Sequence, residues 1–152
     1  MTDQRTVDLA AFVLRLALGV MFIAHSLLLK LVVFTLPGTA QFFQSLGLPG
    51  WSAYVVFALE AVGGVLLVLG IQVRRVSLVL LPILVGAVWV HSGNGWMFAS
   101  ANGGWEYPLY LTVLAGVQVL LGEGAYALGR SEPLVNLDRA APAALVPPQG
   151  KS

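Results

Sequence analysis

The chain lacks cysteine and has few charged residues. None of its 152 residues is cysteine, which excludes disulfides, thiolate nucleophiles and iron–sulfur ligation within this chain. Charged residues make up only 10%, whereas a soluble domain is about a quarter charged. The formal net charge of +1 gives no reason to expect a nucleic-acid partner. Hydrophobic residues make up 58%, more than so small a particle can bury, and we therefore expect a lipid bilayer around it.

Long apolar stretches carry most of this hydrophobic content. Four of them stand out, at about 9–36, 53–71, 76–91 and 107–127. Since a spanning helix needs roughly 20 apolar residues, the sequence predicts an all-α fold, an integral membrane four-helix bundle within residues 1–128. The third stretch is short and contains Pro82, a candidate kink. Residues 37–51 are rich in glycine and proline yet include Phe42 and Phe43, which predicts an interfacial segment in the first outer loop.

The distribution of basic residues predicts the orientation. Four spans place the N-terminus, the 72–75 loop and the tail on one side, together with Arg5, Arg74, Arg75, Arg130, Arg139 and Lys151. The positive-inside rule then puts both termini in the cytoplasm. The opposite side receives all four tryptophans as an aromatic belt, namely Trp51, Trp89, Trp96 and Trp105. Residues 129–152 are rich in proline, alanine and polar residues, which predicts a largely disordered cytoplasmic tail.

Several polar residues interrupt the apolar stretches. At about 1.5 Å of rise per residue, His25 and His91 lie roughly 24 and 23 Å from the inner surface, and Glu60 lies roughly 18 Å from it. The sequence therefore predicts one polar cluster in the outer half of the bundle, formed by His25, Lys30, Glu60, His91, Asn94, Glu106 and Tyr107. A charge at the centre of a membrane helix costs about 2.5–3.5 kcal/mol, so Glu60 needs a partner, with His25 and Lys30 as candidates.

These polar residues allow two interpretations, one functional and one structural. Intramembrane ionisable residues often mark function, but ion pairs can also simply fix helix register. The structural interpretation is the stronger one for Arg15, which we expect to pair with Gln118 or Glu123 in the inner half or to extend to the interface. Gly63 and Gly64 flank the direction of Glu60 and would let a neighbouring backbone approach closely.

The polar cluster also limits which kinds of ligand could bind. Two histidines at equal depth are what bis-histidine haem ligation requires, and with glutamates they would suit a metal. The chain has no ExxH or HExxH spacing, however, and we assign no residue to a metal. A quinone is an easier fit, because it needs only an apolar slot and one or two polar groups at its carbonyls. Histidine and glutamate can also exchange protons with a quinone.

The order of these motifs resembles that of a known family. "RLALGVMFIAHS", which begins at Arg15, resembles the R-x-x-LG-x-x-F-x-x-HG opening of the DoxX family, with a Lys-Leu pair following. "EAVGGVLLVLG", which begins at Glu60, resembles its E-x-x-GG-x-x-L-x-LG second helix. An arginine-bearing turn, a third helix ending at His91, and "EYPL" from Glu106 follow in the family's order. The resemblance extends over about residues 15–124.

This resemblance implies a four-helix protein of the bacterial cytoplasmic membrane. Relatives in the family are linked to thiosulfate:quinone oxidoreduction, to quinone or catechol stress, and to membrane complexes with redox enzymes. Carried over by position, the family's polar signature would be Arg15, His25, Lys30, Glu60, His91, Glu106 and Tyr107.

The leading hypothesis is a membrane subunit of a redox system that binds quinone or a similar lipophilic molecule. His25 and Glu60 would be catalytic, as proton-handling groups. The substrate-binding residues would be Arg15, Lys30, His91, Asn94, Glu106 and Tyr107. Electrons would come from a partner redox protein or a soluble reductant. Two alternatives are a non-catalytic scaffold for an oxidoreductase complex and a small-molecule transporter, which would have to work as a homo-oligomer.

Overall fold

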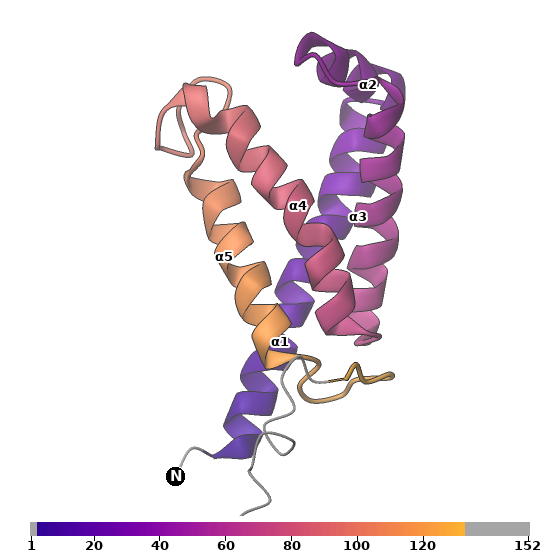
Figure 1. The fold of residues 1–152 in the computed structure, drawn as a ribbon, viewed down its shortest axis with the longest axis vertical. Helices are drawn as coiled ribbons and strands as arrows, with labels where there is room; N and C mark the ends of the chain where they lie inside the picture. Colours follow the sequence, from indigo (N-terminus) through magenta and orange to yellow (C-terminus); the bar gives the residue numbers. More distant parts are fainter. Residues whose placement is uncertain (1–2, 133–152) are drawn as a thin grey trace, which may run out of the picture.

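The computed structural model describes residues 3–132, and within this range the chain forms helices and no β-strand. Their order is α1 (Gln4–Ile23), η1 (Ala24–Val33), α2 (Leu36–Ser45), α3 (Trp51–Leu69), α4 (Val73–His91), η2 (Ser92–Asn94) and α5 (Glu106–Leu121). Figure 1 shows an elongated bundle, with α2 at its upper end. The predicted all-α membrane bundle is confirmed.

Three helical segments of the described range have the length and apolar composition to cross a membrane. They are Gln4–Val33, Trp51–Leu69 and Val73–Asn94. The fourth apolar helix, α5, has 16 residues, which corresponds to about 24 Å of rise. It is therefore shorter than the roughly 30 Å hydrocarbon core of a bilayer.

The first predicted stretch divides into three helical elements. Asp3 caps the start of α1 by accepting a hydrogen bond from the Arg5 amide, so the helix begins before residue 9. The continuous helix ends at Val33, because Thr35 adopts a positive φ of 61°. The Thr35 hydroxyl oxygen then accepts from the Gly38 amide and starts α2. The expected interfacial segment is thus a ten-residue helix that packs against α3 and η1.

The fourth helix ends six residues earlier than expected. Gly122 and Gly124 have φ values of 81° and 67°, a conformation that glycine adopts without steric cost. The chain then turns beneath the bundle, and the Gly129 amide donates to the Gly70 carbonyl over 3.1 Å. Most of the predicted tail, residues 133–152, lies outside the described residues.

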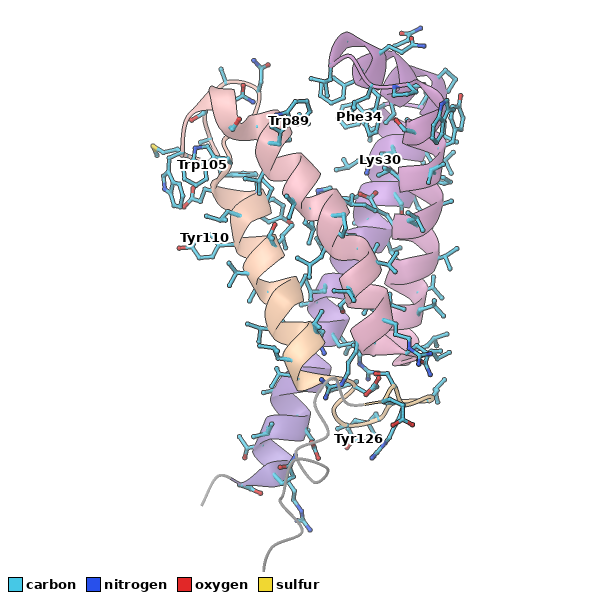
Figure 2. The ribbon with its side chains drawn as sticks, viewed as in Figure 1. Lys30, Phe34, Trp89, Trp105, Tyr110 and Tyr126 are labelled. Atoms are coloured by element: carbon cyan, nitrogen blue, oxygen red, sulfur yellow. The ribbon has the colours of Figure 1, made fainter. Side chains whose placement is uncertain are left out.

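The helices pack as two pairs, α1 with α3 and α4 with α5. In Figure 1 the pairs approach each other at the lower end and stand apart at the upper end. We call the upper end, with α2 and residues 92–105, the outer end. We call the lower end, with the N-terminus and residues 122–132, the inner end. Figure 2 shows Trp89 and Trp105 at the outer end and Tyr126 at the inner end.

Glycine allows the α1–α3 pair to make backbone contact. A Cβ on Gly64 would lie 2.9 Å from the Gly19 carbonyl oxygen, and a Cβ on Gly19 would lie 2.9 Å from the Gly64 carbonyl oxygen. Close approach of this kind is the usual role of small residues between membrane helices. It agrees with the close backbone approach expected at Gly64. The apolar core lies beside this crossing and includes Leu18, Phe22, Leu67, Leu80 and Ala115.

The outer part of the first span is a π-helix of ten residues, η1. Such helices are rare, occur mostly as single turns, and are frequent at functional sites. The buried Ser26 hydroxyl donates to the carbonyls of Phe22 and Ile23, over 2.8 and 3.1 Å. It thereby satisfies backbone oxygens where the helix changes type. Both His25 and Lys30 belong to η1, so this irregular segment positions two of the predicted site residues.

Candidate functional site

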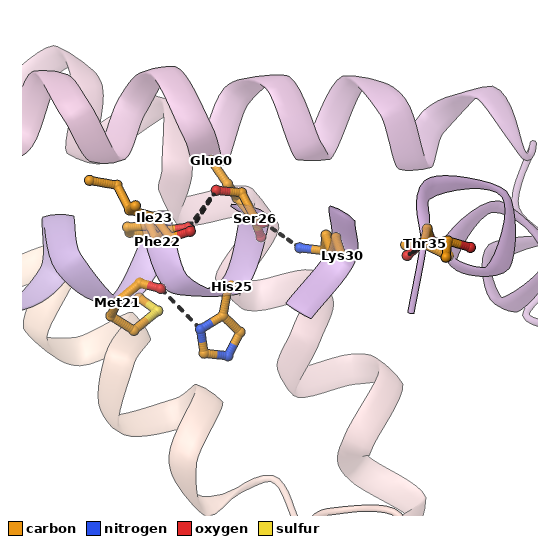
Figure 3. Close-up of polar contacts among 9 residues, drawn as sticks. Met21, Phe22, Ile23, His25, Ser26, Lys30, Thr35 and Glu60 are labelled. Atoms are coloured by element: carbon orange, nitrogen blue, oxygen red, sulfur yellow. Dashed lines mark hydrogen bonds and ion pairs between the residues drawn. The ribbon is translucent and has the colours of Figure 1, made fainter. Parts of the chain in front are cut away.

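An ion pair links the first span to α3. The Lys30 ammonium contacts the Glu60 carboxylate, and Figure 3 shows this contact between η1 and α3. The Glu60 side chain is 6% exposed and that of Lys30 is 17% exposed. Of the two partners that the sequence offered for Glu60, the structure therefore selects Lys30. The pair neutralises a carboxylate that would otherwise be costly to bury.

His25 points away from this ion pair. In Figure 3 its ring lies on the side of η1 opposite Glu60. Its Nδ1 lies 3.0 Å from the Met21 carbonyl oxygen, and because a carbonyl can only accept, Nδ1 must carry the proton. Neutral His25 therefore has a lone pair on Nε2, and no hydrogen bond within residues 3–132 uses it. That nitrogen can accept a proton or a hydrogen bond from a ligand.

Aromatic rings from the other helix pair lie beside His25. The rings of His25 and Tyr107 are stacked, with centroids 6.2 Å apart and planes at 21°. The Phe98 ring lies edge-on to Tyr107, with centroids 5.7 Å apart. Glu106 holds Phe98 in place by accepting a hydrogen bond from its amide over 3.0 Å. We call His25, Phe98 and Tyr107 the aromatic site.

Phe98 was not among the residues predicted from sequence. It stands in the loop between η2 and α5, where neither helical periodicity nor charge singles out an aromatic residue. A tertiary contact with Tyr107 alone identifies it.

His91 and Asn94 belong to a third group. The His91 Nδ1 donates to the Ala87 carbonyl over 2.8 Å, so its Nε2 is also free when the ring is neutral. Asn94 donates to the carbonyls of Asn102 and Gly103, over 3.1 and 2.9 Å. Within residues 3–132, no hydrogen bond or ion pair links His91 or Asn94 to Lys30, Glu60 or His25.

The predicted outer cluster thus exists as three separate groups. The first is the Lys30–Glu60 pair, and the second is the aromatic site with Glu106 behind it. The third consists of His91 at the end of α4 and Asn94 in η2. The residues come from the helices that the sequence indicated, but His25 and Glu60 lie on opposite sides of η1.

The inner polar residues bind backbone carbonyls. Arg15 is fully buried and donates to the carbonyl oxygens of Ala125 and Tyr126, over 3.1 and 3.4 Å. Its guanidinium carbon also lies 5.1 Å from the centre of the Phe12 ring. It makes no hydrogen bond to the expected partners Gln118 and Glu123, because the chain after Gly122 runs alongside α1 and presents its carbonyls to Arg15.

Gln118 and Glu123 also contact the chain that turns beneath the bundle. The Gln118 side-chain amide donates to the Gly122 carbonyl over 2.6 Å, and the Glu123 carboxylate accepts from the Ser131 amide over 2.8 Å. Arg15 therefore lies at the end of the bundle opposite the other predicted substrate-binding residues.

Arg74 has a role that the sequence did not indicate. Its Nη1 donates to the carbonyls of Val119 and Leu120, over 2.8 and 2.7 Å. These carbonyls belong to the last turn of α5, which has no further helical amides to bind. Arg74 thereby supplies hydrogen-bond donors to the carbonyls at the end of α5, which a low-dielectric surrounding would otherwise leave without partners.

Metal ligation finds no support in the described residues. Within residues 3–132, no group of three or more histidine, cysteine, aspartate or glutamate side chains is arranged to hold a metal ion.

The fold and these buried polar groups define a helical-bundle membrane protein. The DoxX family model matches residues 10–93, and the chain belongs to the DoxX family. The matched region contains Arg15, His25, Lys30, Glu60 and His91, whereas Glu106 and Tyr107 lie beyond it.

One curated relative is similar to part of the chain. The Bacillus subtilis (strain 168) protein named "Putative oxidoreductase CatD" is 36% identical over 85 residues, which cover 56% of this chain and 61% of the relative. The alignment thus spans about three fifths of the length of that relative. No solved structure matches the chain.

Proposed function

We propose that this chain is the membrane subunit of a redox system and binds quinone, or a similar lipophilic molecule, at its outer end. In this proposal it lies in the bacterial cytoplasmic membrane with both termini in the cytoplasm. The observation that carries the proposal is the free Nε2 of His25 next to the rings of Tyr107 and Phe98. Flat aromatic rings with a single proton acceptor among them suit a quinone ring.

His25 would exchange protons with the ligand. Reduction of a quinone to a quinol takes two electrons and two protons. The Nε2 lone pair would take a proton from a quinol hydroxyl, and the imidazolium would return it in the reverse direction. Because Met21 fixes Nδ1, the ring presents the same nitrogen to the ligand throughout.

The Lys30–Glu60 pair would hold η1 against α3, because it lies on the side of η1 opposite His25. Glu60 would keep the Lys30 ammonium in position. After the first transfer, His25 would release its proton to water and then accept the second one. His91, Asn94 and Glu106 would shape the loop that covers the outer end, since Asn94 and Glu106 hydrogen-bond to it and the His91 ring lies next to Gly103.

Electrons would come from a partner redox protein or a soluble reductant, as the chain contains no cysteine to carry them. The name of the Bacillus subtilis relative, "Putative oxidoreductase CatD", favours a redox role over transport.

A binding measurement with a matched pair of variants tests the proposal. The protein in lipid nanodiscs is titrated with a short-chain quinone, and quenching of tryptophan fluorescence gives the Kd. His25→Phe keeps the ring and removes both nitrogens, and we expect it to raise the Kd at least about tenfold, as loss of a hydrogen bond of about 1.4 kcal/mol would. Tyr110→Phe removes a hydroxyl from an exposed ring of the same helix as Tyr107, and its Kd should be unchanged.

Two results would contradict the proposal. The first is that quinone does not bind the wild-type chain, and the second is that it binds His25→Phe as tightly as wild type. Stoichiometric recovery of a partner protein without any bound quinone would then favour the scaffold function, and quinone-independent uptake by proteoliposomes would favour the transporter.

A further inference from the structure

An apolar groove lies on the seam between α3 and α4, apart from the candidate site. Its volume is about 230 Å³. Residues Val62 and Leu66 of α3 form one wall, and Val79 of α4 belongs to the other. Since the two helices belong to different pairs, the groove follows the line along which the pairs meet.

Gly63 explains why the groove is closed at its base. A Cβ on Gly63 would lie 2.9 Å from a methyl group of Leu80, so the Leu80 side chain reaches the α3 backbone. The side chains of the groove walls, in contrast, are exposed. Val62 is 60% exposed and Val79 is 52% exposed. In a membrane bundle, apolar side chains this exposed face lipid.

A single charged residue, Arg75, lines the groove. It follows Arg74 in the sequence, yet the two side chains have different surroundings. Arg74 turns inward to the α5 carbonyls, whereas Arg75 is exposed and has no hydrogen bond or ion pair with any residue in the range 3–132. Arg75 stands in the first turn of α4 at the inner end, where lipid headgroups would lie.

We propose that this groove binds an anionic phospholipid, with an acyl chain between α3 and α4 and the phosphate on Arg75. An apolar slot beside an exposed arginine that has no ion pair within residues 3–132 complements a molecule with a hydrocarbon chain and an anionic head. Arginine suits phosphate because its planar fork can donate two parallel hydrogen bonds. The inner leaflet is the one that the basic residues of the chain favour.

This lipid site is independent of the proposed quinone site. It extends from Arg75 near the inner end to Leu59 in the middle of α3, and it shares no residue with the aromatic site or the Lys30–Glu60 pair. Failure of one proposal therefore leaves the other standing.

Native mass spectrometry with defined lipids tests the lipid site. The full chain in detergent is titrated with phosphatidylglycerol or with phosphatidylcholine of the same acyl chains. We expect wild type to retain phosphatidylglycerol at least about fivefold better. Arg75→Gln should bring the two lipids to parity, and Val79→Trp, which fills the groove at an exposed position, should weaken both. Arg5→Gln, an exposed basic residue outside the groove, is the control and should behave as wild type.

The proposal is overturned if the preference for phosphatidylglycerol survives both Arg75→Gln and Val79→Trp. It is also overturned if Val79→Trp converts a dimer to a monomer with no change in bound lipid, because the groove would then be an interface between copies. Displacement of bound quinone, and not of phospholipid, by Val79→Trp would equally contradict it.

Discussion

The two ends of the bundle use buried polar groups in different ways. At the inner end, Arg15 and Arg74 donate to backbone carbonyls of the chain itself. At the outer end, Lys30 and Glu60 bind each other, and His25 leaves one ring nitrogen free. The inner groups thus complete the fold, since each arginine satisfies a carbonyl that no helix amide reaches.

The helix geometry follows the same division. The inner part of the first span is a regular α-helix, and its outer part is the π-helix η1. The helix pairs meet at the inner end and separate toward the outer end (Figure 1). The inner end is regular, and arginine side chains cap its helix ends. The outer end is irregular and holds a histidine nitrogen that can still accept a proton. This difference indicates that a ligand would bind at the outer end. Four substitutions test this difference between the two ends and the helix contacts behind it.

Lys30→Met should cause the largest loss of stability. It leaves Glu60, which is 5% exposed, as an unpaired buried carboxylate, and breaking a buried pair in this way costs about 3–5 kcal/mol. The double variant Lys30→Met/Glu60→Gln should recover part of that loss, because the charge is gone. Unfolding in mixed micelles with increasing denaturing detergent measures both. A double variant less stable than Lys30→Met would show that the pair is not the source of the effect.

Arg15→Met should cost less, about 1–3 kcal/mol, because it leaves the Ala125 and Tyr126 carbonyls without their donor. The same unfolding measurement applies, with Arg5→Met, at an exposed position, as the control. Quinone binding, measured on the folded fraction, should stay at the wild-type value. A lower affinity at full stability would move the ligand toward the inner end.

Gly64→Ala tests the backbone contact that joins α1 to α3. The added methyl group would meet the Gly19 carbonyl oxygen at 2.9 Å, and overpacking of this kind costs about 1–3 kcal/mol. Gly116→Ala is the matched control on α5, because a Cβ there meets nothing within 4 Å. We expect Gly116→Ala to be neutral or stabilising, since alanine is the better helix former. Equal effects of the two substitutions would contradict the close crossing.

His25→Phe should have the smallest effect on stability, below about 1.5 kcal/mol, because it removes one hydrogen bond within its own helix and keeps the ring beside Tyr107. Its effect should appear in ligand binding and not in unfolding. The two measurements together separate a functional histidine from a structural one. A large loss of stability without a change in quinone affinity would assign His25 to the fold.

Much of the fold could be predicted from the sequence because a bilayer constrains it strongly. Apolar length located the spanning helices, and the glycine pattern near Glu60 indicated the close approach at Gly64. Helix ends were harder to place. The ending of the first span at Thr35 and of α5 at Gly122 depends on local φ angles, and Arg74 supports the early end of α5 through a tertiary contact that sequence spacing cannot reveal.

The candidate site was predictable in depth but not in direction. Counting residues placed His25, Lys30 and Glu60 in the outer half, and Lys30 was a named candidate partner of Glu60. The rotation of each side chain about its helix was not accessible, because an α-helical period does not apply within the π-helix η1. For the same reason the sequence merged His25 with the ion pair, although the ring turns toward Tyr107. Nothing in the sequence pattern distinguished Phe98 from other loop residues.

Photo-crosslinking tests whether the ligand binds at the outer end of the bundle. The protein in its native membrane is labelled with an azido-quinone, and the labelled peptides are identified by mass spectrometry. We predict labels within residues 23–30 and 96–107, which contain the aromatic site, with competition by unmodified quinone and loss of the label in His25→Phe. Competed labels that map to residues 122–131 or to the α3–α4 groove would contradict the account.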